Sequence, residues 1–376
     1  MHRRQALMTW NKPIKAAGFT LLELLISMAM GITVMSGVVS VLVVSKSNYI
    51  TERELAGLQE NARFALKFLT EEIQMAGYNG CNDNALNVAN SVNFSADDAW
   101  YLGGVGLIGY EEFANETDRA GFPDDYEGAA SYYSDSIAIR RGEQSGLRIA
   151  PGPPYHNPNS ANIPLNDAHD IKPGTIMVIS SADCQQVGVF QMSGPTNNSN
   201  NATNIVHNTG RGLSPGNCTK DIGGNFSCGA GTSAGSTYPP GSSLMRMSSQ
   251  GFYVGTSSVG AGIPALFLIS LGLDEANDAA IVSSDELVQG VELMQISYGV
   301  DLVDDDGLAD QYMDADNGSM DWDAVVSVRL NLRMRSVFPV YNENVVYGEF
   351  MSIDDTDGAD RFMRQAIGTT IQLRNR

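Results

Sequence analysis

A long apolar run near the N-terminus dominates the hydrophobic pattern of this chain. The 26 residues from Phe19 to Val44 carry one charge, that of Glu23, and such a run is long enough to span a membrane as a helix. Beyond Val44, apolar residues recur at spacings of three and four, which predicts that the helix continues as an amphipathic one to about Tyr78. The predicted apolar stripe consists of Leu55, Leu58, Ala62, Leu66, Leu69 and Ile73.

The rest of the chain has the pattern of a β-rich head. In Asp323–Arg335, apolar residues alternate with polar and basic ones, which predicts a strand with one buried and one basic face. The run of residues 193–243 is rich in Gly, Asn, Ser and Thr and predicts a long surface loop. Because no strand–helix alternation is present, we expect an α+β fold in which the helix packs on an antiparallel sheet. Other strand candidates lie at 137–139, 175–180, 187–192, 251–255, 264–271, 287–301 and 367–374.

The order of the N-terminal signals is unusual for a secreted protein. A leader with four basic residues precedes Gly18, and the apolar run follows it. An ordinary secretory signal is instead cut after its apolar stretch. The string GFTLLELLISMAM, which starts at Gly18, resembles the class III signal of type IV prepilins.

This resemblance implies a processing site and a division of the chain. A membrane peptidase would cut between Gly18 and Phe19 and methylate the new N-terminus, and the family's assembly glutamate falls on Glu23. Residues 1–18 would be the leader, 19–44 the membrane and filament-core helix, 45–78 its amphipathic continuation and 79–376 the pilin-like head. The alternative is an uncleaved signal anchor in which the glutamate is incidental.

A carboxylate in hydrocarbon also needs a physical explanation. Its insertion costs about 2.5–3.5 kcal/mol, which an opposite charge at the same depth can offset. The α-amine of a neighbouring processed subunit is the predicted partner of Glu23.

Three further stretches resemble PilW-type minor pilins: residues 58–81, 181–193 and 298–312, the last followed by the strand at 322–335. The resemblance implies a structural subunit that primes pilus assembly with other minor pilins, the major pilin, the prepilin peptidase and the inner-membrane assembly machinery. One alternative is a minor pseudopilin of a type II secretion system. An alternative of another class is a membrane-anchored periplasmic enzyme or a Ca²⁺-dependent binding protein.

Charge constrains orientation and partners. The basic leader predicts a cytoplasmic N-terminus with the head in the periplasm, and the resemblance implies that the head finally lies on the pilus at the cell surface. The net charge is −20, and removal of the four basic leader residues leaves −24. Such an acidic chain is not expected to bind nucleic acid.

The four cysteines all follow the membrane helix. In an oxidising periplasm an even number favours two disulfides. Cys218 and Cys228 flank a short glycine-rich stretch, so their pairing is the simplest of the three connectivities, which leaves Cys81 with Cys184.

No catalytic constellation is predicted, and the chain is not expected to be an enzyme. The histidines His156, His169 and His207 lie in polar stretches that resemble loops, and no phosphate-binding glycine loop is present. The only cofactor considered is Ca²⁺, because carboxylates crowd around Gly307; a solvated acidic turn is the alternative. The candidate ligands are Asp301, Asp304, Asp306 and Asp310, and a similar run occupies residues 354–360.

The arginines of the strand at 323–335 allow two interpretations. Arg329, Arg333 and Arg335 lie on its polar face and could bind an acidic partner. Pairing with acids of neighbouring strands is the favoured interpretation, because the chain is rich in acids.

Overall fold

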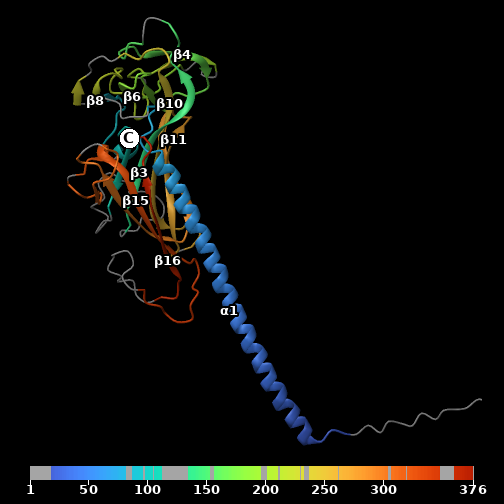
Figure 1. Ribbon diagram of the computed structural model, residues 1–376. Coiled ribbons are helices and arrows are strands. Elements are labelled where there is room, and N and C mark those ends of the chain that lie inside the picture. The colour runs from blue at the N-terminus through green and yellow to red at the C-terminus, as the bar shows by residue number, and fades with distance from the viewer. Residues whose placement is uncertain are drawn as a thin grey trace, which may run out of the picture. The chain divides into compact units, whose positions relative to one another are not determined.

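The computed structural model describes residues 18–81, 87–95, 98–104, 106–111, 134–152, 156–195, 201–210, 212–228, 230–232, 237–260, 262–303, 306–318, 320–347 and 360–375. The chain divides into two units, Met1–Arg53 and Glu54–Arg376, and each is described by itself. Helix α1, Leu21–Gln74, supplies residues to both. The second unit is the head, and Figure 1 shows that it consists mainly of strands.

The part of α1 that belongs to the head buries a single stripe. The stripe agrees with the prediction except that Leu55 is 37% exposed and Leu66 only partly buried, whereas Ala65 is fully buried. Ala65 lies three residues after Ala62 and four before Leu69, so it fits the helical spacing of the stripe as well as Leu66 does. The buried residues are Leu58, Ala62, Ala65, Leu69 and Ile73.

The helix ends at Gln74, earlier than the predicted end at Tyr78. Residues 75–77 form a turn, and Gly77 has a φ of 77°, a conformation that glycine adopts without strain. The Gly77 N–H donates to the Arg140 carbonyl at 3.1 Å, and the Arg374 N–H donates to the Gln74 carbonyl at 3.3 Å. The helix therefore stops where its last groups find partners in the head.

The strands form two main sheets and one small one. The bounds are β1 Asn87–Asn90, β2 Gly106–Tyr110, β3 Ser136–Arg148, β4 Asn162–His169, β5 Ile176–Ser180, β6 Gln186–Gln191, β7 Ala202–Val206, β8 Asn225–Ser227, β9 Ala230–Thr232, β10 Ser243–Thr256, β11 Pro264–Asp274, β12 Ala279–Gln289, β13 Val291–Val300, β14 Gln311–Met313, β15 Val325–Arg335 and β16 Arg364–Gln372. Two short helices, α2 (Ala99–Leu102) and η2 (Trp322–Ala324), complete the described elements.

The ten-stranded sheet has the order β12-β11-β10-β5-β6-β1-β8-β9, with β3 paired to β10 and β2 paired to β3. The four-stranded sheet has the order β14-β13-β15-β16, and β4 pairs with β7. Figure 1 places β4, β6 and β8 at one end of the head and β15 and β16 at the other. The buried stripe of α1 shares one hydrophobic core with both main sheets, including Phe252 and Leu266 from one and Met294 and Leu330 from the other.

Two predicted features of the sheets are wrong. The single strand expected at 287–301 is divided by Gly290, where the chain leaves the larger sheet and enters the smaller one. Gly290 has a φ of 87°, and a Cβ there would lie 2.6 Å from the Arg335 carbonyl oxygen, so only glycine fits this corner. The larger sheet is also mixed, because β1 runs parallel to β6 and β8.

The expectation that residues 193–243 form a surface loop is also wrong for the described residues. This stretch contains β7, β8 and β9, and its side chains Ile205, Ile222 and Tyr238 are fully buried in a second core with Phe190. A few well-spaced apolar residues hold the segment against the sheet although its average composition is polar. The α+β class therefore fits the chain, with a head that is mostly β.

Candidate functional site

The predicted cleavage junction lies immediately before α1. Gly18 to Thr20 precede the helix, and Phe19 is 86% exposed. A Cβ placed on Gly18 would meet nothing within 4 Å. The packing of this chain therefore gives no reason for a glycine at this position. Residues 1–17, the rest of the predicted leader, lie outside the described residues.

Glu23 makes contacts that the sequence interpretation missed. The Thr20 N–H and its hydroxyl both donate to Glu23 Oε2 at 3.0 Å, and the Glu23 N–H donates to Thr20 Oγ1 at 3.2 Å. This reciprocal arrangement is a capping box, which satisfies free N–H groups of a helix N-terminus. The sequence Thr-Leu-Leu-Glu at 20–23 has the required spacing and could have revealed it.

The apolar part of α1 has no buried side chain from Leu21 to Val44. Among the described helices it alone is long and apolar enough to cross a membrane. Its hydroxyl side chains bond to carbonyls of the same helix: Ser27 to Glu23, Thr33 to Met30 and Ser40 to Ser36, at 2.5–2.9 Å. Polar groups in hydrocarbon must find such internal partners, so this segment is a candidate membrane anchor.

Both disulfides join the cysteines in the expected pairs. Cys81 bonds to Cys184 with 5.7 Å between their Cα atoms, and Cys218 bonds to Cys228 with a Cα separation of 6.0 Å. The first links the segment after α1 to the β5–β6 turn, across 103 residues of sequence. The second closes a local loop of the segment that packs on the second core.

The acidic turn after β13 directs its carboxylates to its own backbone. Asp301 accepts from the Gly307 N–H at 2.8 Å, and Asp310 accepts from the N–H groups of Leu302 and Val303 at 2.8 and 3.0 Å. Asp306 accepts from the Leu308 N–H. Asp304 lies outside the described residues, as does most of the run at 354–360. Within the described part of the chain, no three His, Cys, Asp or Glu side chains are grouped so that they could hold a metal ion.

Arg333 and Arg335 of β15 pair with an acid, which is the favoured interpretation. Glu292 lies 3.1 Å from Arg333, 3.5 Å from Arg335 and 2.7 Å from Arg364, which also contacts Asp360 at 2.7 Å. Burial opposes the charge of Arg364, but its hydrogen bonds to Glu292 and Asp360 raise its pKa overall. The predicted basic face is covered at Arg333, which is buried.

The remaining arginine of that face, Arg329, stacks 3.9 Å above the Tyr312 ring. The arginines of β15 are therefore engaged within the head. Arg333 and Arg335 join β15 to Glu292 of β13, whereas Arg329 is exposed and stacks on Tyr312 of β14.

Two histidines that were assigned to loops form a buried pair. His156 and His207 lie with ring centroids 6.3 Å apart, beside Tyr238 and Phe190. Burial lowers the pKa of His156 to about 4, and burial together with His156 lowers that of His207 to about 3. Both imidazoles are neutral at physiological pH and serve as core side chains.

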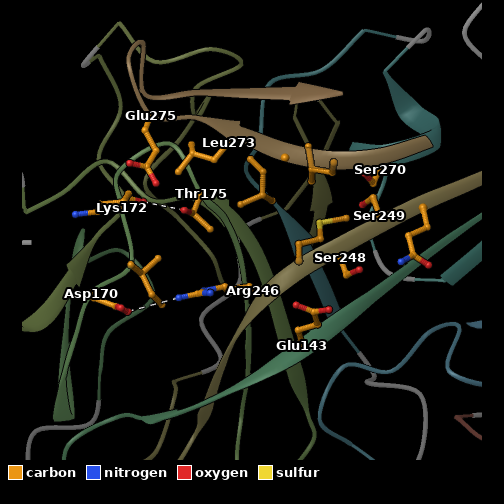
Figure 2. Close-up of a pocket in the computed structure, with 16 residues that line it drawn as sticks. Glu143, Asp170, Lys172, Thr175, Arg246, Ser248, Ser249, Ser270, Leu273 and Glu275 are labelled. Carbon is orange, nitrogen blue, oxygen red and sulfur yellow. Dashed lines mark hydrogen bonds and ion pairs between the residues drawn. The ribbon is translucent and has the colours of Figure 1, made fainter. Parts of the chain in front are cut away.

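An open cavity of about 530 Å³ lies on the larger sheet. Figure 2 shows Arg246 paired with Asp170 on one side, and Ser248, Ser249 and Ser270 along the other. Gln250 on β10 pairs with Ser270 on β11. Gln250 lies two residues before Phe252, and Ser270 lies two residues after Leu268. Residues two apart share a face of a strand, so the cavity continues the sheet face on which the α1 stripe packs.

The described residues define a class of protein: one candidate membrane anchor at the N-terminus and a β-rich head with two disulfides. Residues 251–375 match the family model described as Type IV Pilus-assembly protein W. The match confirms the PilW-family resemblance over about the last third of the chain, from the second half of β10 to β16, and supports a role in type IV pilus assembly. No curated protein and no solved structure matches the chain.

Proposed function

We propose that this chain is a minor pilin of a type IV pilus, made as a prepilin and active in priming pilus assembly. The observation that carries the proposal is the junction from Gly18 to Glu23 in front of a wholly exposed apolar helix. The C-terminal match to a pilus-assembly family supports the same system. Neither feature alone would distinguish a pilus subunit from an ordinary membrane-anchored protein.

Processing would occur at the bond between Gly18 and Phe19. This bond precedes Leu21, the first helical residue. A Cβ on Gly18 would meet nothing within 4 Å, and the Phe19 side chain is exposed. A peptidase could therefore reach it without unwinding the helix. The glycine, which the chain's own packing does not require, would be required by the peptidase.

The exposed apolar half of α1 would first lie in the inner membrane and then pack with other pilin helices in the filament. The head would remain periplasmic and contact other minor pilins. An apolar helix surface can contact lipid tails or pack against neighbouring helices, so the same helix suits both locations. The major pilin and the inner-membrane assembly machinery would be the further partners.

Glu23 would change partners during this sequence. In the unprocessed chain its carboxylate caps the helix through Thr20. After cleavage each subunit carries a new α-amine at Phe19, and a neighbour's amine at similar depth is the proposed partner of Glu23. The ion pair would set the vertical register of one subunit against the next. A subunit that keeps this glutamate is therefore proposed to lie beneath another minor pilin.

Three variants separate docking from capping. Glu23→Gln keeps a capping side chain but removes the charge, so we expect lower recovery of partner pilins and less surface piliation. Thr20→Val removes the hydroxyl of the cap and keeps the charge, so assembly should stay near the wild-type level. If Glu23→Ala fails while Glu23→Gln assembles normally, the role of Glu23 is the helix cap alone.

The function itself is tested by shearing pili from cells that express tagged wild-type protein or Gly18→Glu. We expect the wild type in the sheared pilus fraction and the variant in the inner membrane with its leader attached. Recovery of the processed wild type only with secretion-system pseudopilins would instead assign the chain to type II secretion. Absence from both assemblies would favour an anchored periplasmic protein.

A further inference from the structure

The outer edge of β12 carries backbone N–H and C=O groups that have no partner among the described residues. β12 is the last strand of the ten-stranded sheet and pairs only with β11 in the described sheet. The Ala280 N–H points away from β11, since it donates to the Ser214 carbonyl at 2.9 Å. Because outward groups alternate along an antiparallel strand, Val282 and Ser284 also turn their N–H and C=O groups to this edge.

Both ends of the edge are covered, and its middle is not. Ser214 covers the start at Ala279 and Ala280, and the Asn61 side chain donates to the Gln289 carbonyl at 3.1 Å. Among the described residues, no backbone group outside β11 bonds to the backbone N–H or C=O groups of residues 281–288. Edges are protected by proline, by charged side chains such as lysine, or by β-bulges. β12 contains no lysine or proline, and its acids and its register irregularity lie after Ser284, beyond the open groups. A row of open donors and acceptors like this one is a template for an added strand.

All charged side chains of the β11–β12 hairpin are acidic. From Pro264 to Gln289 it contains five Asp or Glu residues and no Lys or Arg. Glu286 is used within the head, where it accepts from Ser257, Ser258 and Gln289. Asp285 is exposed, and no hydrogen bond or ion pair of the described residues engages it. It shares a strand face with Ile281, which is 44% exposed.

The surface beside this edge can receive side chains. Ser283 lies on the same face as Ser270, with 3.4 Å between their hydroxyl oxygens, and Ser270 lines the cavity of Figure 2 together with Glu275. An added strand would alternate its side chains between this hydroxyl-lined face and the opposite one. Its basic side chains would meet Asp285 and Glu275.

We propose that the free edge of β12 binds an extended segment of another protein that carries basic residues at alternate positions. Backbone hydrogen bonds to Val282 and Ser284 supply the pairing, and the acidic hairpin selects a basic strand. A second copy of this chain is a poor occupant because its net charge of −20 opposes self-association.

The test uses the full chain in detergent and a synthetic peptide of about eight residues, the length of a strand, with the sequence Lys-Val-Lys-Val-Thr-Val-Lys-Val. We expect binding that slows amide hydrogen exchange in the fragment covering 279–289. Asp285→Lys should weaken the affinity about five- to tenfold. The matched control is Glu343→Lys, since Glu343 is an exposed acid outside the hairpin, and it should bind as the wild type does.

Two control peptides separate strand pairing from charge attraction. A peptide of equal charge with prolines at alternate positions cannot donate to the edge and should not bind, nor should the same strand with glutamates in place of lysines. Equal binding of the proline peptide, no binding of the lysine peptide, or no effect of Asp285→Lys would overturn the proposal. Concentration-dependent protection of 279–289 without peptide would overturn it in favour of self-association.

Discussion

The two parts of α1 differ in where they place their apolar side chains. From Leu21 to Val44 every side chain is exposed, whereas between Leu58 and Ile73 five are buried against the two sheets. The second part has apolar residues on one face and the first has them on all faces. A one-sided stripe finds its partner in the same chain, and an all-round apolar surface requires lipid or other helices. Truncating an apolar side chain should therefore destabilise the head in the second part of α1 and leave its stability nearly unchanged in the first.

The largest expected difference is between Leu69→Ala and Val38→Ala. Leu69 is fully buried, so its truncation should cost about 2–5 kcal/mol of unfolding free energy. Val38 is half exposed and touches no core, so its truncation should change the free energy of unfolding by less than about 0.5 kcal/mol. Urea unfolding of the full chain in detergent, followed by the fluorescence of buried Trp100, measures both. Equal losses would break the comparison.

The next largest effect concerns the disulfide that follows the buried part of α1. Replacing Cys81 and Cys184 by serine removes a bridge across 103 residues and should cost about 2–4 kcal/mol. Replacing Cys218 and Cys228 should cost less, because that loop is short. The same unfolding assay compares the two double variants. A larger loss for the local bridge would show that the 218–228 segment matters more than the helix end.

A smaller effect is the pH dependence of the head core. The pKa values of His156 and His207 lie near 4 and 3 in the folded chain and near 6.5 when unfolded. The unfolded chain therefore binds more protons below pH 6.5, and stability falls as the pH decreases from 6.5 towards about 4. We expect a loss of about 1 kcal/mol between pH 7 and 6 from this pair. His207→Phe keeps the ring contact with Phe190 and should flatten the profile, and an unchanged profile would contradict the assignment.

The smallest effect sharpens the comparison through glycine. A Cβ on Gly37, in the apolar part, or on Gly57, in the head part, would meet nothing within 4 Å. Gly57→Ala should stabilise the head by about 0.5–1 kcal/mol, because alanine favours the helix. Gly37→Ala should leave head stability unchanged, so any loss of partner recovery would be due to contacts with other subunits. Normal assembly of both variants would show that Gly37 makes no close interhelical contact.

The sequence predicted the features that depend on long, repeated patterns. The helix, most strands, the disulfide pairs and the ion pairing of β15 followed from periodicity, cysteine count and charge. Features that depend on single residues were missed. Gly290 divides a strand because the chain changes sheets there. The capping box depends on two residues, Thr20 and Glu23, and leaves no repeated pattern.

Burial inside the polar stretch was also missed, for a physical reason. Composition averages over many residues, whereas Ile205, Ile222 and Tyr238 reach the core individually. The mixed sheet could not be predicted either, because the parallel pairing of β1 depends on residues nearly one hundred positions away. At the candidate site, the sequence left both a Ca²⁺ site and a solvated acidic turn open around Gly307, because the hydrogen bonds of these carboxylates to the turn are invisible in the sequence.

The most direct test of the proposed function is to determine at which residue the mature chain begins. Intact-mass and N-terminal sequence measurements on protein purified from pilus or membrane fractions should find a chain that begins at N-methylated Phe19 and contains both disulfides. A chain that still begins at Met1, isolated from cells with an active prepilin peptidase, would contradict the proposal that this protein is a processed pilus subunit.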